Sequence, residues 1–301
     1  MRSHFSQNTI LKKGNTMKKE IKKINEKSLK IGDEILELKN PIAGTDYYIC
    51  KKETGELIII ENNYNKEIEN LEILGGFHYG LIPENFKARN NIDKKHAKKI
   101  RGINSYSIWT KTHRPTCKPN GMTYNPKLKI WLDIYMCNSN HKQVGTSAPN
   151  QNFLAGGNSH GRVNPHGKDD FLYKDFEEVA KEHDKRFITF DEFISSMRGV
   201  KEFSSAKDED NGITKHNPDF VSMYGIEQAT GHNWIWSEKI DHEKAVGLGG
   251  DRDGASCSGS RASLWSNYVW DSSWRIGVRF ACDSLKLDEK SESDFSKQKN
   301  K

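Results

Sequence analysis

The second half of the chain, from Gly225 onward, contains only short strand-like pieces joined by long loops. The pieces read "HNWIWSE", "AVGLGG" and "RIGVRFAC", and the loops between them are rich in glycine and serine. No stretch in this region has the apolar spacing of a helix, whereas two such stretches precede it. The chain is therefore predicted to adopt an α+β fold with two early helices and an irregular second half that is dominated by loops.

Two helices are predicted between residues 169 and 200. The first lies in "DDFLYKDFEEVAKEHDK", where Asp169 or Asp170 is available as the N-cap. The second lies in "TFDEFISSMRGV", where Thr189 and Glu192 have the spacing of a capping box. Each helix has an apolar stripe, formed by Leu172, Phe176, Val179 and Ala180 in the first and by Phe190, Phe193, Ile194 and Met197 in the second. These stripes are expected to pack in the core and not to hold a cofactor.

Strands are predicted in two earlier regions. The segment "KLKIWLDIYMCN" has apolar side chains on both faces, which is typical of a strand covered on both sides. One face carries Leu128, Ile130, Leu132 and Ile134, and the other carries Trp131 and Tyr135. The runs "TDYYICK" and "ELIIIEN" flank "KETG", in which Gly55 supplies the turn of a small β module.

These elements divide the chain into four predicted parts. Residues 1–30 are polar and are expected to form a loosely ordered tail. Residues 31–70 form the small β module, which is expected to attach or oligomerise the protein. Residues 71–286 form the main domain, and residues 287–301 are charged and expected to be disordered.

Charge and hydropathy limit the possible partners. The net charge is +6, but many of the lysines lie near the chain ends and no basic run has interleaved aromatic residues, so nucleic-acid binding is not expected. No segment approaches the roughly 18 apolar residues of a membrane span, so membrane insertion is not expected either. The first twenty residues lack the apolar stretch of a signal sequence, and "MKKEIKK" makes Met17 an alternative start. Synthesis in the cytoplasm is therefore expected.

Five widely spaced cysteines without a CxxC motif point to a reduced compartment and give no zinc knuckle. A disulfide between Cys257 and Cys282 is an open alternative if the protein ends up outside a cell. The loop "NSHGRVNPHGKDD" brings together His160, His166, Asp169 and Asp170, but such residues on a loop of this composition are usually solvated. No metal and no cofactor are therefore predicted.

The segment from Gly249 to Asp283 differs from the rest of the chain in composition. It contains no Lys, Glu, Gln or Met, although Lys and Glu are common elsewhere. Trp265, Trp270 and Trp274 are expected to anchor it by packing, with short polar side chains between them. Aromatic anchors separated by adaptable Ser, Gly, Asn and Asp are typical of a binding paratope. The alternative is a Gly/Ser-rich surface loop with buried tryptophans.

A set of short motifs gives a more specific indication. They are "KRFITFDEF" at 185–193, "NWIWSE" at 233–238, "LGGDRD" at 248–253, "GSRAS" at 259–263 and "RIGVRFACD" at 275–283. In this order they resemble the C-type lectin fold of the formylglycine-generating-enzyme type over about residues 75–285. Within that fold, the chain most resembles the variable proteins of diversity-generating retroelements, a group that includes phage tail tropism determinants.

That resemblance implies a function and a site. In the family, Asn codons of the form AAC or AAT are randomised, and they never yield Lys, Glu, Gln, Met or Trp. The diversified, ligand-binding positions are then expected at Asp251, Arg252, Asp253, Ser256, Leu264, Ser266, Asn267, Asp271, Ser273 and Arg275. The resemblance implies a phage or prophage receptor-binding protein in the virion tail that contacts a host-surface protein or glycan and other tail proteins. A homotrimer is expected, which would add avidity.

Two other functions stay open. The first is a tail structural protein or adhesin of the same fold with a fixed surface. The second is a formylglycine-generating type of oxidase, whose cysteine lies in a "C-R-S-A" context. Here that context reads Ser260-Arg261-Ala262-Ser263, and a serine hydroxyl is a poor substitute for a thiolate. An enzyme is therefore not expected.

Overall fold

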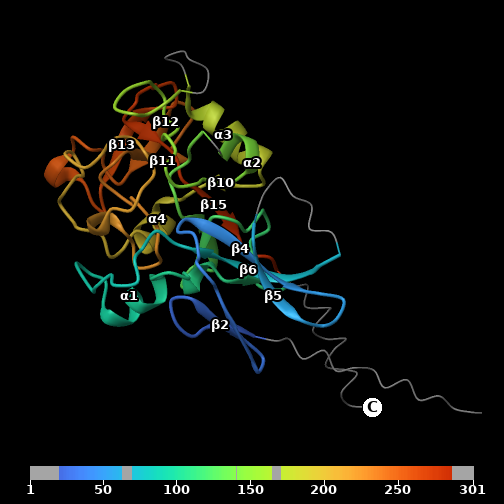
Figure 1. Cartoon of the computed structure of the whole chain (residues 1–301). Helices are drawn as coiled ribbons and strands as arrows, with labels where there is room; N and C mark the ends of the chain where they lie inside the picture. The colour runs from blue at the N-terminus through green and yellow to red at the C-terminus, as the bar shows by residue number, and fades with distance from the viewer. Residues whose placement is uncertain (1–19, 63–69, 140, 165–170, 287–301) are drawn as a thin grey trace, which may run out of the picture.

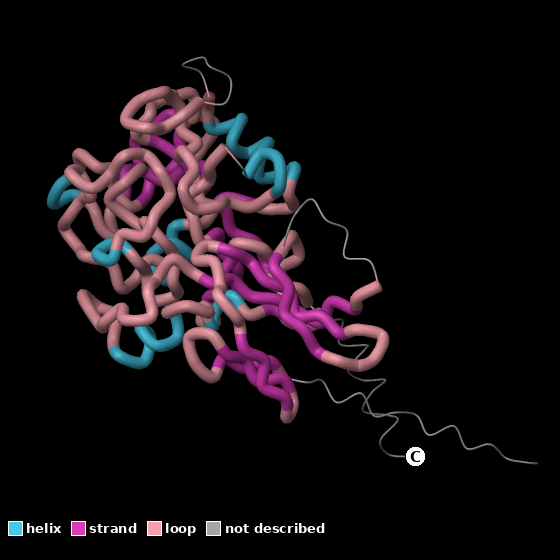
Figure 2. The backbone as a smooth tube through the Cα atoms, viewed as in Figure 1, coloured by secondary structure: helices cyan, strands magenta, loops and turns pink. Residues whose placement is uncertain are grey.

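The computed structural model describes residues 20–62, 70–139, 141–164 and 171–286. Many short strands and few helices are connected by long loops, which make up most of the region that contains β11 to β13 (Figure 2). This confirms the α+β class and the loop-rich second half. Within the described part of the chain, no helix combines the length and apolar character that crossing a bilayer requires.

The N-terminal sheet is antiparallel and has the order β1-β2-β3. Its strands are β1 (Ile21–Lys23), β2 (Ser28–Ile31) and β3 (Glu34–Glu37). Leu29 and Ile31 of β2 are buried against the next sheet. The expected tail over residues 1–30 is therefore wrong for β1 and β2, because two apolar side chains in a polar stretch are enough to fix this strand. Residues 1–19 lie outside the described part.

The second sheet has the order β5-β4-β6-β7. Its strands are β4 (Thr45–Lys51), β5 (Leu57–Glu61), β6 (Glu72–Tyr79) and β7 (Trp109–Thr110). The β4–β5 hairpin turns at Gly55, whose φ of +90° favours glycine, as predicted. β4 also pairs with β6, which lies beyond the boundary expected at residue 70. The predicted β module and the following domain thus share one sheet.

The central sheet has the order β10-β15-β9-β8. Its strands are β8 (Met122–Asn125), β9 (Ile130–Asp133), β10 (Arg186–Phe187) and β15 (Phe280–Asp283). All of β9 is buried, with Ile130 and Leu132 in one apolar cluster and Trp131 in another, which confirms a strand covered on both sides. Leu128 is an exception, because it precedes the strand and is exposed.

The fourth sheet has the order β13-β12-β11-β14 and carries the candidate site. Its strands are β11 (Trp234–Lys239), β12 (Lys244–Leu248), β13 (Ser263–Tyr268) and β14 (Ile276–Gly277). β14 runs parallel to β11, and the other neighbours are antiparallel. In Figure 1 this sheet lies at the opposite end of the molecule from β2.

The helices are α1 (Lys94–Ile100), α2 (His141–Val144), α3 (Tyr173–Glu182) and α4 (Phe190–Ser196). The capping box predicted for α4 is confirmed, since Thr189 and Glu192 accept each other's backbone N–H. The N-cap prediction for α3 is wrong. The cap is Leu172, whose N–H donates to the Asp175 carboxylate at 2.6 Å, while Asp169 and Asp170 lie outside the described residues.

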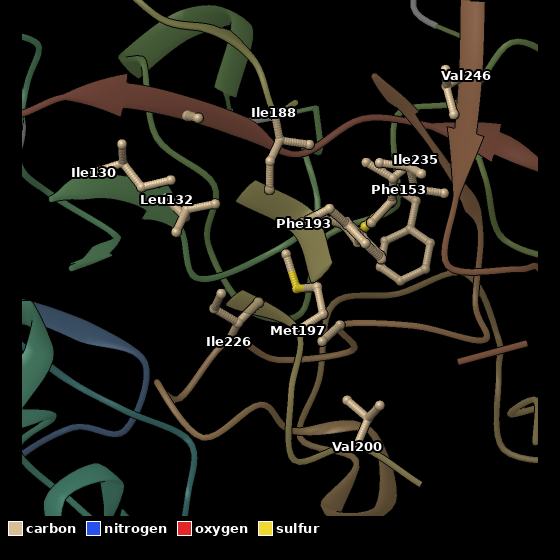
Figure 3. Packing of buried hydrophobic residues seen from close by; sticks show 14 residues of the cluster. Ile130, Leu132, Phe153, Ile188, Phe193, Met197, Val200, Ile226, Ile235 and Val246 are labelled. Carbon is tan, nitrogen blue, oxygen red and sulfur yellow. The ribbon is translucent and has the colours of Figure 1, made fainter. Parts of the chain in front are cut away.

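The core places α3 and α4 beneath the fourth sheet. Phe193 of α4 and Met197, its C-cap, share a cluster with Leu132 of β9, Ile235 of β11 and Val246 of β12 (Figure 3). Phe176, Val179 and Ala180 of the α3 stripe pack with Trp236 of β11 and Phe280 of β15 in a second cluster. These residues are core, as predicted, and give the sheet that carries the site a rigid support, whereas Leu172 and Ile194 are half buried and lie outside both clusters.

Arg279 is a buried cation that joins separate segments of this core. Its guanidinium donates to the carbonyl oxygens of Asp133 at 2.8 Å, Ile134 at 2.7 Å and Glu227 at 2.7 Å. Desolvation lowers the pKa of Arg279 to about 10, despite the favourable charge of Asp133. Asp133 also accepts from the buried Lys185 at 2.6 Å. The hydrogen bonds of the two terminal nitrogens make such burial tolerable, although the buried Nε of Arg279 has no partner among the described residues.

Candidate ligand-binding surface

The loop after β12 begins with two glycines that no other residue can replace without strain. Gly249 and Gly250 have φ values of +91° and +77°, and a Cβ on Gly250 would lie 2.2 Å from Ser258 Oγ. The loop then closes on itself, because the Asp251 carbonyl accepts from Gly254 N at 3.1 Å and from Ser258 Oγ at 3.2 Å. The turn that follows β12 thus has a defined conformation.

Arg275 is half exposed and connects this loop to the start of β14. Its guanidinium lies 3.1 Å from the Asp253 carboxylate, 3.8 Å from that of Asp251 and 5.1 Å from the centre of the Trp274 ring. Asp251 is only 3% exposed, and burial raises its pKa despite the neighbouring charge of Arg275. The buried carboxylate of Asp251 therefore supports Arg275. The prediction that Asp251 is displayed toward a ligand is wrong.

Arg252 holds the loop after β12 against the segment that contains Lys207 and Asp210. Its guanidinium donates to the carbonyl oxygens of Lys207 at 2.8 Å and Asp210 at 3.0 Å, and its side chain is 15% exposed. These contacts are made to backbone atoms, so they hold the loop in place and leave little of the side chain for a ligand.

β13 is the edge strand of the sheet and exposes aromatic side chains. Trp265 is 50% exposed, and its ring lies 5.3 Å from that of Phe190, the first residue of α4. Ser266 is exposed and Leu264 is half buried. Asn267 is 8% exposed and lies against Gly247 of β12, so its predicted display is also wrong.

Beyond β13 the chain forms an aromatic stack. The rings of Tyr268 and Trp270 lie 4.9 Å apart and 15° from parallel, and the Lys244 ammonium lies 5.5 Å from the Tyr268 ring centre. Trp270 is 52% exposed. The prediction that Trp265 and Trp270 anchor the segment by packing is therefore wrong. Trp265 lies in the edge strand β13 and Trp270 in the turn after it, and about half of each side chain is in solvent.

Trp274 does anchor the segment, as predicted. It is half buried, and its ring lies 4.5 Å from the His160 ring and 5.3 Å from the Arg162 guanidinium. Next to it, the Ser272 hydroxyl donates to the Gly156 carbonyl at 2.7 Å. A Cβ on Gly156 would lie 2.5 Å from Ser273 N, so the backbones of these two segments are in contact here.

Asp271 and Ser273 are half buried and shape this return of the chain. The Asp271 carboxylate accepts from Tyr268 N at 2.8 Å, and Ser273 Oγ accepts from Arg275 N at 3.2 Å. Both side chains therefore make local turn contacts, and each keeps part of its surface in solvent.

The structure divides the ten predicted positions by exposure. Four are exposed, four are half buried and two are buried. The exposed ones are Asp253, Ser256, Ser266 and Arg275; the half-buried ones are Arg252, Leu264, Asp271 and Ser273; the buried ones are Asp251 and Asn267. Three exposed aromatics differ from the prediction: Trp265 and Trp270 are predicted to be packed, and Tyr268 is not singled out. Trp265 and Tyr268 lie in the edge strand β13 and Trp270 in the turn after it, a tertiary position that local composition does not carry.

The exposed side chains form what we call the display surface, which has two parts. The polar part lies at the β12–β13 turn and the start of β14, and consists of Asp253, Ser256 and Arg275. The aromatic part lies along β13 and the turn after it, and consists of Trp265, Ser266, Tyr268 and Trp270.

A groove of about 1100 Å³ borders the polar part. It lies between α4 and residues 256–262, and Ile194 and Phe203 contribute apolar side chains to its lining. Phe203 is 80% exposed and has a φ of +53°. The structure therefore places a further exposed aromatic residue, Phe203, in the groove that Ser256 also lines.

The residues considered for chemistry are not brought together. Among the described residues, no group of three or more His, Cys, Asp or Glu side chains has an arrangement that suits a metal ion. His160 stacks on Trp274, while His166 lies outside the described part. The Ser260 hydroxyl donates to Glu202 Oε1 at 2.5 Å, so it is a structural contact. All five cysteines are free thiols, and the Cys257–Cys282 disulfide is not formed.

The fold is that of the C-type lectin class, as the motifs predict, and solved structures support this assignment. The chain superimposes on the Major Tropism Determinant M1 variant with a TM-score of 0.74 at 24% identity, over 91% of this chain and 85% of that one. The U1 variant gives a TM-score of 0.72 at 24% identity, over 89% and 84%.

Sequence similarity extends to a curated protein. The chain is 29% identical over 287 residues to the tail fiber receptor-binding protein of Bordetella phage BPP-1, which covers 82% of this chain and 73% of that protein. No family model matches the chain. The resemblance to tropism determinants that the motifs indicate is thereby confirmed.

Proposed function

We propose that the chain is a phage or prophage receptor-binding protein of the virion tail, and that the display surface contacts the host. The observation that carries the proposal is the aromatic part of this surface, where Trp265 and Trp270 are each about half exposed. Large aromatic side chains in solvent, next to polar side chains, are typical of binding hot spots. The similarity to a tail fiber receptor-binding protein supports the same function.

The support beneath the surface fits this role. The α3 and α4 stripes and the buried Arg279 fix the sheet from below, while the exposed side chains make few contacts with the core. Replacement of an exposed side chain should therefore alter the ligand contact and leave the fold unchanged. The partner would be a protein or glycan of the host surface.

The arrangement also supports different roles for the two ends of the molecule. The N-terminal sheet lies at the opposite end from β11, β12 and β13 (Figure 1). We infer that the N-terminal end attaches to other tail proteins and to further copies of the chain, in a homotrimer that gains avidity.

Diversification is proposed for a smaller set of positions than the sequence indicates. The exposed and half-buried positions can change without an internal clash, whereas Asp251 and Asn267 are buried. The gene's codons at the eight accessible positions should end in C or T, as descendants of AAC and AAT codons do. Codons ending in A or G at these positions would contradict diversification while leaving receptor binding untouched.

Binding is tested with labelled protein on cells of the strain that the phage infects. The double variant Trp265→Ala/Trp270→Ala should weaken binding at least about tenfold, because truncated hot-spot aromatics cost roughly 2 kcal/mol or more each. The matched control is Ile42→Ala, which removes an apolar side chain of similar exposure, 54%, from the loop before β4. It should bind like the wild type.

The polar part is tested separately with Asp253→Ala/Arg275→Ala. We expect a smaller loss, because solvent-exposed charge pairs contribute about 1 kcal/mol or less. If both double variants bind as the wild type does and remain folded, the display surface is not the receptor-binding site.

A further inference from the structure

Cys117 and Cys282 lie next to each other beside an isolated antiparallel bridge. Pro115 is paired with Ser284, and the flanking hydrogen bonds run from Thr116 N to the Asp283 oxygen at 2.9 Å and from Leu285 N to the Arg114 oxygen at 2.8 Å. Each cysteine lies two residues from this bridge on its own segment, so the bridge holds the two segments close together at the cysteines.

The contact between the two side chains suits a disulfide. Cys117 N donates to Cys282 Sγ at 3.2 Å, and the Cys117 thiol also hydrogen-bonds to Cys282 Sγ. Two sulfurs that already touch need little backbone movement to reach disulfide geometry. Both residues belong to one apolar cluster with Met122 and Trp131.

Within this pair, Cys282 is the more reactive sulfur. The hydrogen bond from the Cys117 thiol lowers the pKa of Cys282 to about 6 and raises the pKa of Cys117 well above its ordinary value, so Cys282 supplies the attacking thiolate. Burial instead raises the pKa of Cys50 to about 11 and that of Cys137 well above its ordinary value. Cys257 is exposed.

We propose that Cys117 and Cys282 form a disulfide when the folded protein meets an oxidising medium that contains a small disulfide such as oxidised glutathione. The Cys282 thiolate attacks one sulfur of the oxidant and releases one glutathione thiolate. The Cys117 thiol then loses its proton and attacks the mixed disulfide, which releases the second glutathione. Two protein thiols become one disulfide, and the oxidant takes up both electrons and both protons to become two thiols.

Cys117 and Cys282 are buried, at 5% and 2% exposure, but they lie just beneath the surface. Thr116 and Lys118 on either side of Cys117 are exposed, and the Thr116 hydroxyl lies 3.1 Å from Cys282 Sγ, so a local opening of this segment lets the oxidant reach the sulfurs. The cross-link ties β15, the last strand of the central sheet, to the segment before β8. It closes a chain loop that contains the whole display surface, so it should stabilise the surface against unfolding.

The test uses the full chain with Cys257→Ser, which removes the exposed thiol and thus random intermolecular pairing. The folded protein is incubated with oxidised glutathione, quenched with N-ethylmaleimide in urea and analysed by non-reducing peptide mapping. We expect one cross-linked peptide pair joining Cys117 to Cys282, with the mass loss of about 2 Da that disulfide formation requires. Cys50 and Cys137 should be alkylated.

Thermal unfolding supplies the second readout. The oxidised protein should unfold roughly 4–10 °C higher than the reduced protein, and a reductant should reverse the shift. The same treatment of a Cys257→Ser/Cys282→Ser variant should give neither cross-link nor shift. The proposal is overturned if both thiols are alkylated after oxidation, or if Cys282 stops at a glutathione adduct. The comparison of oxidised and reduced protein stands even if the double variant fails to fold.

Discussion

His232 lies directly behind the display surface and is 1% exposed. Its Nδ1 lies 2.8 Å from the Thr230 carbonyl, which only accepts, so Nδ1 carries the hydrogen. Its Nε2 is buried and has no hydrogen-bond partner among the described residues. A second proton on Nε2 would have no acceptor, and the ring packs edge-on against Phe220 at 5.2 Å. The structure therefore holds this histidine in its neutral form.

The energetic consequence follows from the pKa of His232, which desolvation lowers from 6.5 to about 4. The unfolded chain takes up this proton below its pKa of about 6.5, whereas the folded chain does so only near pH 4. The contribution to stability is thus complete above pH 6.5 and is lost as the pH falls toward 4. At about 1.4 kcal/mol for each pKa unit, the loss approaches ~3 kcal/mol.

Urea unfolding at several pH values between 7 and 4 measures this loss in the wild type and in His232→Asn. Other groups titrate in the same range, and His216 beside Glu227 has a raised pKa that acts in the opposite direction. Subtracting the pH profile of the variant from that of the wild type cancels the contributions of these other groups. As the pH falls, the wild type should lose about 2–3 kcal/mol relative to the variant, whatever the variant costs at pH 7.

The matched control is His242→Asn, which changes an exposed histidine in the β11–β12 turn. This variant keeps His232, so it should show the same loss of stability between pH 7 and 4 as the wild type. Parallel profiles for His232→Asn as well would refute the reasoning, since they would mean that burial of His232 does not oppose its protonation.

Two further predictions concern the support of the display surface. Thr189→Ala removes the hydroxyl that accepts from Glu192 N at the start of α4, so urea unfolding should show a loss of about 1 kcal/mol; an unchanged midpoint would contradict the role of the cap. Trp236→Ala empties a site that is 1% exposed and should cost about 3–5 kcal/mol, whereas Trp270→Ala should change stability by no more than about 0.5 kcal/mol. Equal costs for the two tryptophans in thermal unfolding would contradict the assignment of core and surface.

Local features of the fold could be predicted because local physics decides them. The capping box of α4 depends on two residues three positions apart, and the hairpin turn depends on a positive φ at Gly55. The strand at Ile130–Asp133 follows from its alternating apolar side chains. In each case the deciding partners are close in sequence.

The site could be predicted only in part, because exposure is decided by segments that are distant in sequence. Trp265 and Trp236 are both tryptophans in strands, yet one lies at the sheet edge and is half exposed while the other lies above α3 and is buried. Buried charges such as Arg279 could not be predicted either, because charged side chains normally lie in solvent and only the tertiary structure supplies their partners. The same holds for Cys282, whose neighbour is Cys117 and not Cys257.

The parallel pairing of β14 with β11 fixes where the segment after β13 returns to the sheet, through Trp234 opposite Ile276. Both ends of the excursion are thus held by main-chain hydrogen bonds, and these do not depend on how many residues lie between them. Insertions at the tip near Trp270 would add only a loop-closure cost, about 0.6 kcal/mol for each doubling of length. The architecture therefore permits the recognition segment to evolve in length as well as in composition.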